Sequence, residues 1–268
     1  MLNKISTLTD YQELLSNYAP IKIYSNDYIQ TEVPVLISKN RLFECHTSNN
    51  LFLFVKKEIG YRAYYYIGNL EEVLDFSTID NLVVEILYRG IKFYPQKEID
   101  YFSKCGFTIN LIRDQYCAVY KDLTKGKSVE GIFVEEANSL DEVKDACELF
   151  NNSFDVLSGD YISKDKYQEL LTNNQILIAK NMEGNFLGAL HQTLEKGVAW
   201  ISHVAVLPEA RGKHVGQALL NSFVENNHIT EKQRYMFWVQ QQNIAAVSMY
   251  QKKGFKYLNK STISLIKK

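Results

Sequence analysis

The residues best suited to chemistry lie in one segment, Val204-Ala205-Val206-Leu207-Pro208-Glu209-Ala210-Arg211-Gly212-Lys213-His214-Val215-Gly216. An apolar stretch leads into a Pro-Glu turn, a basic loop with glycine, and then a pattern typical of a helix start. Such a junction directs free backbone N–H groups and the positive end of a helix dipole toward one point, where phosphate binds. Arg211 and Lys213 add positive charge. Taken alone, the segment fits an ordinary turn with solvated basic residues equally well, because short glycine motifs are common.

A second segment, further along the chain, distinguishes these readings. It is Asn243-Ile244-Ala245-Ala246-Val247-Ser248-Met249-Tyr250-Gln251-Lys252-Lys253-Gly254-Phe255. In this order the two segments resemble the GNAT family of N-acetyltransferases, whose signature joins a Gln/Arg-x-x-Gly-x-Gly/Ala loop to an Asn-x-x-Ala-x-x-x-Tyr-x-x-x-Gly-Phe helix. The residues in register with that helix are Asn243, Ala246, Tyr250, Gly254 and Phe255. The resemblance covers residues 131–268.

The resemblance implies a domain that uses acetyl-CoA as acyl donor. Backbone amides from Arg211 to Gly216 would hold the CoA pyrophosphate. Val204 and Val206, on a strand splayed from its neighbour, would pair with pantetheine and polarise the thioester carbonyl, while Asn243 would bind pantetheine or the adenosine-side phosphates. The cofactor-binding residues predicted in this way are Val204, Ala205, Val206, Arg211, Gly212, Lys213, His214, Val215, Gly216, Asn243, Ala246 and Tyr250.

Tyr250 has a second implied role, protonation of the leaving thiolate. A phenol of pKa about 10 donates to a thiolate whose conjugate acid has a pKa of about 8.5 only if it is well positioned, which a helix achieves. The competing interpretation is that Tyr250 is a core aromatic residue at helical spacing. The loop departs from the family pattern at His214, which stands where the pattern has its first glycine. Its β-carbon would crowd the pyrophosphate, or its imidazole would donate to it; backbone donation survives in both cases.

The general base is harder to assign. In this family a carboxylate or histidine often lies two or four positions before the residue that matches Val204, but Ser202 and Trp200 stand there. Strand alternation turns the adjacent His203 to the opposite face, and a β-bulge could re-aim it. His203 is thus a candidate catalytic residue or a packed histidine, and His191 is a weaker candidate. A water chain, or an amine that arrives neutral, would need no side-chain base.

The polar stretch at 121–131 suggests a domain boundary, with an α/β domain at residues 1–127 and a GNAT domain at 128–268. The second half alternates strands and helices, with a capping box at Ser139-x-x-Glu142. The expected fold is α/β, with a mixed, mostly antiparallel sheet flanked by helices. Further elements are predicted as strands at 132–135, 175–179, 187–194, 198–206, 234–239 and 257–266, and as helices at 164–171, 215–225 and 244–253.

The first half shows strand patterns at 51–55, 62–67 and 82–87, a helix capped by Thr9-x-x-Gln12, and a helix at 99–104 closed by Gly106. Its segment Tyr101–Phe107 echoes Met249–Phe255. The match leaves chance and duplication open. This half has no comparable glycine loop, so it is not expected to bind CoA. If it is a diverged GNAT-like copy, it resembles the silent half of tandem acetyltransferases, and its role is to complete the sheet and one wall of the acceptor site.

The amino-acid composition limits the classes of partner that we expect for this protein. The formal net charge is −1 over 268 residues, so no global field attracts nucleic acid or an anionic membrane. Four cysteines show no metal-ligand spacing, and neither a secretory signal nor a membrane-spanning run is present, which favours a cytoplasmic protein without a metal. The predicted activity is direct acetyl transfer, in a ternary complex, to a small-molecule amine or a peptide. A silent acyl-CoA-binding or regulatory module and aminoacyl transfer from charged tRNA are the alternatives. The oligomeric state is left open.

Overall fold

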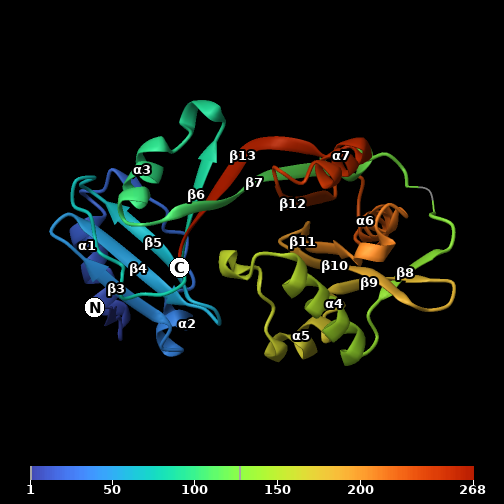
Figure 1. Cartoon of the computed structure of the whole chain (residues 1–268), viewed down its shortest axis with the longest axis horizontal. Helices are drawn as coiled ribbons and strands as arrows, with labels where there is room; N and C mark the ends of the chain where they lie inside the picture. The colour runs from blue at the N-terminus through green and yellow to red at the C-terminus, as the bar shows by residue number, and fades with distance from the viewer. Residues whose placement is uncertain (1, 127) are drawn as a thin grey trace. The chain divides into compact units, whose positions relative to one another are not determined.

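The computed structural model describes residues 2–126 and 128–268 and divides into two compact units (Figure 1). Unit 1 comprises Met1–Ile112, Val156–Gly159 and Lys260–Lys268, and unit 2 comprises Arg113–Asp155 and Asp160–Asn259. Each unit is thus built from more than one stretch of chain. No helix in the described ranges is long and apolar enough to cross a membrane.

Unit 2 contains a six-stranded sheet in the order β7-β12-β11-β10-β9-β8. All neighbours are antiparallel except β11 and β12, which are parallel. The strands are β7 (Thr108–Val119), β8 (Ile132–Glu136), β9 (Ile176–Asn181), β10 (Phe186–Glu195), β11 (Val198–Val206) and β12 (Arg234–Gln240). The helices are α4 (Leu140–Ser153), α5 (Tyr167–Thr172), α6 (Val215–Asn226) and α7 (Ile244–Lys253). The mixed α/β sheet predicted for this half is confirmed.

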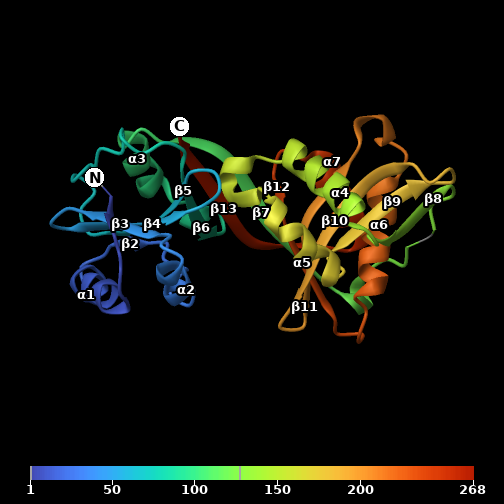
Figure 2. The ribbon, with the colours of Figure 1, turned by 90° about the horizontal axis from the view of Figure 1, so that it is seen from below.

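Helices lie on both faces of this sheet (Figure 2), and an apolar cluster joins each helix layer to it. Residues of α6 and α7, including Leu219, Phe223 and Tyr250, pack with Leu190 in one cluster. Residues of α4 and α5 pack with the side chains of β9 to β11 in the other, around Phe150. Ser139 caps α4 as predicted, because its hydroxyl accepts a hydrogen bond from Glu142 N, but the Glu142 carboxylate accepts from Asn138 N and not from Ser139 N as a capping box requires. Burial of these apolar stripes fixes both helix layers on the sheet.

Unit 1 repeats the same plan with different detail. Its sheet runs β1-β3-β4-β5-β6-β13, with β2 on β5, and among the described residues of this unit only β5 and β6 pair in parallel. The strands are β1 (Asn3–Lys4), β2 (Tyr24–Ser25), β3 (Leu42–His46), β4 (Asn50–Lys56), β5 (Tyr61–Ile67), β6 (Leu82–Arg89) and β13 (Lys256–Lys267). The helices are α1 (Leu8–Tyr18), α2 (Val33–Ser38) and α3 (Gln96–Lys104). Residues 68–81 connect β5 to β6 without a helix, at the place of α6 in unit 2.

The echo between the two halves is structural. Helices α3 and α7 both end at a glycine with positive φ, +86° at Gly106 and +110° at Gly254. A buried phenylalanine follows each glycine, and Phe107 N and Phe255 N donate to Phe102 O and Tyr250 O respectively. This is the hydrogen-bond pattern of a Schellman C-cap. Each half of the chain therefore follows a parallel strand with a helix of the same ending.

Two local expectations need correction or extension. The first helix begins at Leu8, whereas the predicted cap at Thr9 would have the helix begin at Asp10. Thr7 and Asp10 form its capping box instead, because the Thr7 hydroxyl accepts from Asp10 N and the Asp10 carboxylate accepts from Thr7 N. The strand β7, which the sequence reading missed, pairs through Arg113–Val119 with the whole of β12. The suggested boundary at 127/128 stays a prediction, and it falls after this strand.

Candidate functional site

The parallel strands β11 and β12 pair along only part of their length. Their register runs from Val198 opposite Arg234 to Ile201 opposite Phe237, and β11 continues alone to Val206. This is the splay that the family resemblance implied. Beyond the last pair, β11 keeps β10 on one side only, so its backbone polar groups on the other side face the gap between the strands.

A bulge lies just beyond the last pair. Ile201 stands opposite Gln192 and His203 opposite His191, which leaves Ser202 without a partner in the register. Ile201 and Val204 therefore contact the same apolar cluster although they are three residues apart. Because of this extra residue, Ile201 is the residue before the bulge that shares a cluster with Val204, and neither Trp200 nor Ser202 belongs to that cluster.

The loop after β11 takes the backbone conformation that an anion site needs. Gly212 has φ +78° and His214 has φ +64°, both in the left-handed region that favours glycine. His214 thus adopts a glycine-like conformation at the position where the family pattern has glycine. It is the residue before α6, and within the described chain no side chain caps the first turn of that helix. The N–H groups of this turn are left to bind an external acceptor.

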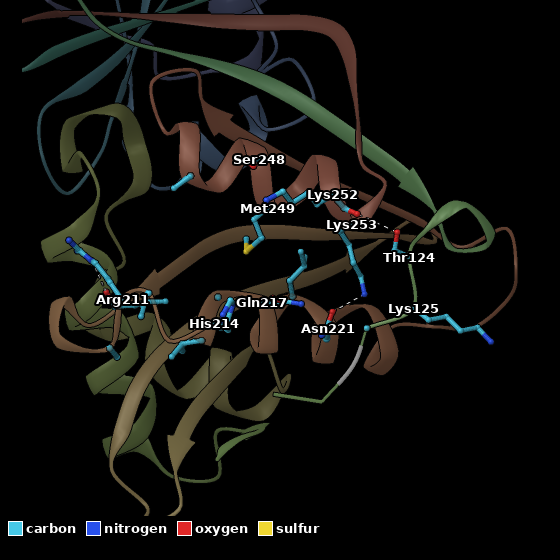
Figure 3. Close-up of a pocket in the computed structure, with 18 residues that line it drawn as sticks. Thr124, Lys125, Arg211, His214, Gln217, Asn221, Ser248, Met249, Lys252 and Lys253 are labelled. Atoms are coloured by element: carbon cyan, nitrogen blue, oxygen red, sulfur yellow. Dashed lines mark hydrogen bonds between the residues drawn. The ribbon is translucent and has the colours of Figure 1, made fainter. Parts of the chain in front are cut away.

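A pocket of about 590 Å³ lies against this loop (Figure 3). The predicted residues that line it are Val206, Arg211, Gly212, His214, Val215 and Gly216. The rest of the wall comprises Thr124, Lys125, Gly126, Ala210, Gln217, Leu220, Asn221, Ala245, Ser248, Met249, Lys252 and Lys253. No carboxylate occurs among these described lining residues, whereas Lys125, Arg211, Lys252 and Lys253 are cationic. The pocket therefore suits a large anionic ligand with apolar parts.

The sequence reading missed most of the wall contributed by α6 and α7. On α6 these residues continue from Gly216 to Gln217, Leu220 and Asn221, and on α7 they include Ala245, Ser248 and Lys252. Their spacing of three and four residues is that of one helix face, so extending the two matched segments along that face would have found them. Thr124–Gly126 had no local signal, because only the tertiary structure carries that segment past α6.

The comparisons with known proteins agree with this geometry. The family model described as "Acetyltransferase (GNAT) domain" matches residues 172–257, which contain β11, the loop, α6, β12 and α7. Residues 172–257 form a GNAT domain. No protein in the curated set matches the chain.

Solved structures extend the likeness of fold to the whole chain. A GCN5-related N-acetyltransferase from Sphaerobacter thermophilus matches with a TM-score of 0.60 at 12% identity, over 84% of this chain and 79% of that one. A tandem GNAT protein from the clavulanic acid biosynthesis pathway matches with a TM-score of 0.59 at 10% identity, over 100% and 98% of the two chains. A GNAT-family acetyltransferase from Colwellia psychrerythraea gives 0.52 at 14% identity, over 99% and 98%. The chain has the tandem GNAT fold.

The predicted residues Asn243 and Tyr250, at the start and in the last turns of α7, lie outside the pocket wall. Asn243 is the residue before α7, and its side-chain oxygen accepts a hydrogen bond from Ala246 N at 3.2 Å. Tyr250 is 5% exposed and packs on Phe237, with ring centroids 4.0 Å apart. Burial raises the pKa of Tyr250, so its hydroxyl keeps its proton at neutral pH. Val204, Ala205, Lys213 and Ala246 are also absent from the lining residues, although Val204 and Ala246 pack against the same cluster as Tyr250.

The histidines lie on the other face of the GNAT sheet. His203 is buried and contacts Phe150 and Phe154, with ring centroids 5.2 Å and 5.0 Å away, next to α4. Its Nδ1 is 3.2 Å from Nδ1 of His191 on β10. Desolvation lowers the pKa of His191 to about 4. The bulge at Ser202 thus leaves His203 on the α4 side, away from the cluster that Val204 contacts.

Proposed function

We propose that this protein is an N-acetyltransferase that moves an acetyl group from acetyl-CoA directly to an amine of a small-molecule or peptide acceptor. The observation that supports this most strongly is the pocket of unit 2. It joins the uncapped start of α6 to a wall without carboxylates, beside a strand whose backbone is open beyond Ile201. Acetyl-CoA would supply the activated thioester.

The residues of unit 2 would divide the work as follows. Amides of the Arg211–Gly216 loop and the first turn of α6 would hold the pyrophosphate. The open backbone of β11 at Val204 and Val206 would pair with pantetheine and polarise the thioester carbonyl. The Tyr250 hydroxyl would give its proton to the sulfur as the amine nitrogen bonds to the carbonyl carbon and the carbon–sulfur bond breaks. Most of the rate gain would come from holding amine and thioester together.

His203 and His191 are weaker candidates for the base that removes the amine proton. Both lie on the α4 face, and the low pKa of His191 keeps it neutral at pH 7. A neutral imidazole accepts a proton, but one with a pKa of about 4 is a weak base. An acceptor that binds as the neutral amine would release its remaining proton to water after the carbon–nitrogen bond forms, and would then need neither histidine.

The bulge also favours a second candidate, an acyl-CoA-binding or regulatory module without catalysis. It places Ile201, rather than a carboxylate or histidine, on the face of Val204. A thiol-release assay with acetyl-CoA against a panel of amines, amino acids and peptides tests both. Release that depends on one amine class, with the acetylated product found by mass spectrometry, supports the enzyme. Tight acetyl-CoA binding without release on any acceptor supports the module, and no binding overturns both.

A further inference from the structure

One lysine of the pocket is buried. Lys253, the last residue of α7, is 8% exposed and still lines the pocket. Its Nζ donates to the side-chain oxygen of Asn221 on α6 at 2.7 Å (Figure 3). Within the described residues no carboxylate forms an ion pair with it. Burial lowers the pKa of Lys253, and Glu225 offsets this in part. Burial of an ammonium group whose hydrogen-bond acceptor is an amide oxygen costs free energy of folding unless an anion binds next to it.

Unit 1 shows that the fold does not require a cation at this position. Helices α3 and α7 end with the same C-cap, and in the matching segments Cys105 corresponds to Lys253. Cys105 is 5% exposed, so both positions are buried. A small neutral side chain therefore satisfies the end of this helix in unit 1. The charge of Lys253 is a feature of the pocket in unit 2.

The position of Lys253 along α6 fits a second phosphate. Asn221 lies five residues after Gly216 on the same helix, which is about 7.5 Å along the axis. That distance is comparable with the span of one ribose and its two phosphoester bonds. In Figure 3, His214, Gln217 and Asn221 follow one another along α6, and Lys253 reaches from α7 to the far end of this row. A ligand with its pyrophosphate at the start of α6 would carry the next phosphate toward Lys253.

A short segment before β8 fixes this end of the pocket. Thr124 N donates to Lys253 O at 2.8 Å, and the Thr124 hydroxyl donates to Lys252 O at 3.3 Å. A β-carbon at Gly126 would meet the side-chain amide of Asn221 at 2.3 Å. The close approach at Gly126 and the hydrogen bonds of Thr124 hold Asn221 and Lys253 in place, so the ammonium is preorganised rather than free to swing into solvent.

We propose that Lys253, held by Asn221, binds the ribose 3′-phosphate of CoA and makes unit 2 selective for 3′-phosphorylated CoA thioesters. This inference rests on the proposed function, since it assigns one further contact to the same ligand. Lys253 is thereby a specificity-determining residue, separate from the acetyl-transfer chemistry.

The test compares CoA with 3′-dephospho-CoA by titration calorimetry on the full chain. Wild type is expected to bind CoA about ten to one hundred times more tightly, the value of one buried charge-assisted hydrogen bond. Lys253→Met keeps the apolar stem and should bring this ratio close to one, with dephospho-CoA affinity almost unchanged. Asn221→Asp should also bring the ratio close to one, because its carboxylate would form an ion pair with the Lys253 ammonium and repel the phosphate. Lys256→Met is the control, an exposed lysine outside the pocket wall whose loss should leave the ratio intact.

The outcomes separate this inference from the proposed function. Equal binding of the two ligands by wild type, or a ratio kept in Lys253→Met or Asn221→Asp, overturns the inference and leaves the proposed function standing. A purely structural Lys253 would weaken both ligands alike, which also overturns it. If wild type binds neither ligand, the proposed function fails and the inference fails with it. If one of the two variants does not fold, the other still tests the contact, and a wild-type ratio of one overturns the inference without either.

Discussion

Each unit contains two parallel strands that separate part-way along their length. A side chain fills the gap between these strands in unit 1, whereas the gap in unit 2 leads into the pocket. In unit 1, β5 and β6 pair only from Tyr61 to Ala63. Beyond that point Asn26, which is 2% exposed, fills the gap: its amide nitrogen donates to Glu85 O at 2.8 Å and its oxygen accepts from Tyr65 N at 2.8 Å. In unit 2 the backbone of β11 beyond Ile201 meets no such residue from an inserted strand in the described chain, and the pocket reaches β11 at Val206.

The segment after β11 in unit 2 and the segment after β5 in unit 1 also differ in whether their backbone N–H groups are already hydrogen-bonded. In unit 2 the loop leads into α6, whose first N–H groups are uncapped. In unit 1 the turn after β5 is satisfied internally, because the side-chain oxygen of Asn50 accepts from Gly68 N and Asn69 N at 3.0 Å and 2.9 Å. Amides that are already bonded offer nothing to a phosphate. We therefore expect a shared fold to bind an anion only where its backbone donors remain open.

The largest expected effect is on the open site of unit 2. Gly216→Asp places a carboxylate against the site expected for the pyrophosphate and should weaken CoA binding by at least about 10³-fold, since like-charge contact costs several kcal/mol. Gly216→Ala is the matched control: its β-carbon would lie 3.6 Å from Met249 Sδ, an ordinary contact. Calorimetry on both variants measures the difference. Residual tight binding in Gly216→Asp would show that unit 1 also holds CoA, against the comparison.

The next effect is on the closed gap of unit 1. Asn26→Ala leaves Tyr65 N and Glu85 O without their partner and should lower the free energy of unfolding by about 3–4 kcal/mol. Hydrogen exchange should speed up at the Tyr65 amide, and CoA binding should not increase. Asn17→Ala, on the exposed side of α1, should change stability by less than about 0.5 kcal/mol. Denaturation monitored by circular dichroism compares the two; equal stabilities would mean that Asn26 does not hold the gap.

The third prediction concerns Tyr250, the proposed proton donor, which is replaced by the residue type that unit 1 has at the matching position. Phe102 corresponds to Tyr250 in the matching segments, so unit 1 lacks the hydroxyl. Tyr250→Phe should keep acetyl-CoA affinity and the packing on Phe237 but lower kcat by about 10²-fold, or about 2.7 kcal/mol. Loss of kcat with KM kept marks an interaction made in the transition state. Full activity in this variant, on a confirmed acceptor, would remove Tyr250 from the mechanism. His203→Ala, measured alongside, should cost less than about tenfold.

The smallest effect concerns pH and the histidine pair of unit 2. The pKa of His191 is about 4 when folded and about 6.5 when unfolded, so the unfolded chain takes up the proton between these values. This contribution to stability is present above pH 6.5 and is lost as the pH falls. From pH 7 to pH 5 it should cost about 2 kcal/mol. Both tryptophans, Trp200 and Trp238, belong to unit 2, so their fluorescence follows its unfolding. His191→Gln should flatten this pH dependence; an unchanged slope would contradict the assignment to His191.

The sequence by itself determined the parts of the site that follow local rules. The loop from Val204 to Gly216 and the helix from Asn243 to Phe255 were readable because capping, helix starts and glycine endings depend on residues three to five positions apart. Strand alternation likewise predicted that His203 faces away from Val204. These signals sufficed to predict the GNAT domain at the matched residues, the loop that lines the pocket and the similar endings of α3 and α7.

The tertiary structure decided what depends on partners far away in the chain. The bulge at Ser202 exists through pairing with β10, and no local pattern marks it. Asn26 closes the gap of unit 1 by bonding to residues 39 and 59 positions away, and Lys253 meets Asn221 over 32 positions. Buried polar groups take whatever partner the packed fold brings within reach, so their roles are settled by long-range packing, which residue spacing along the chain does not encode.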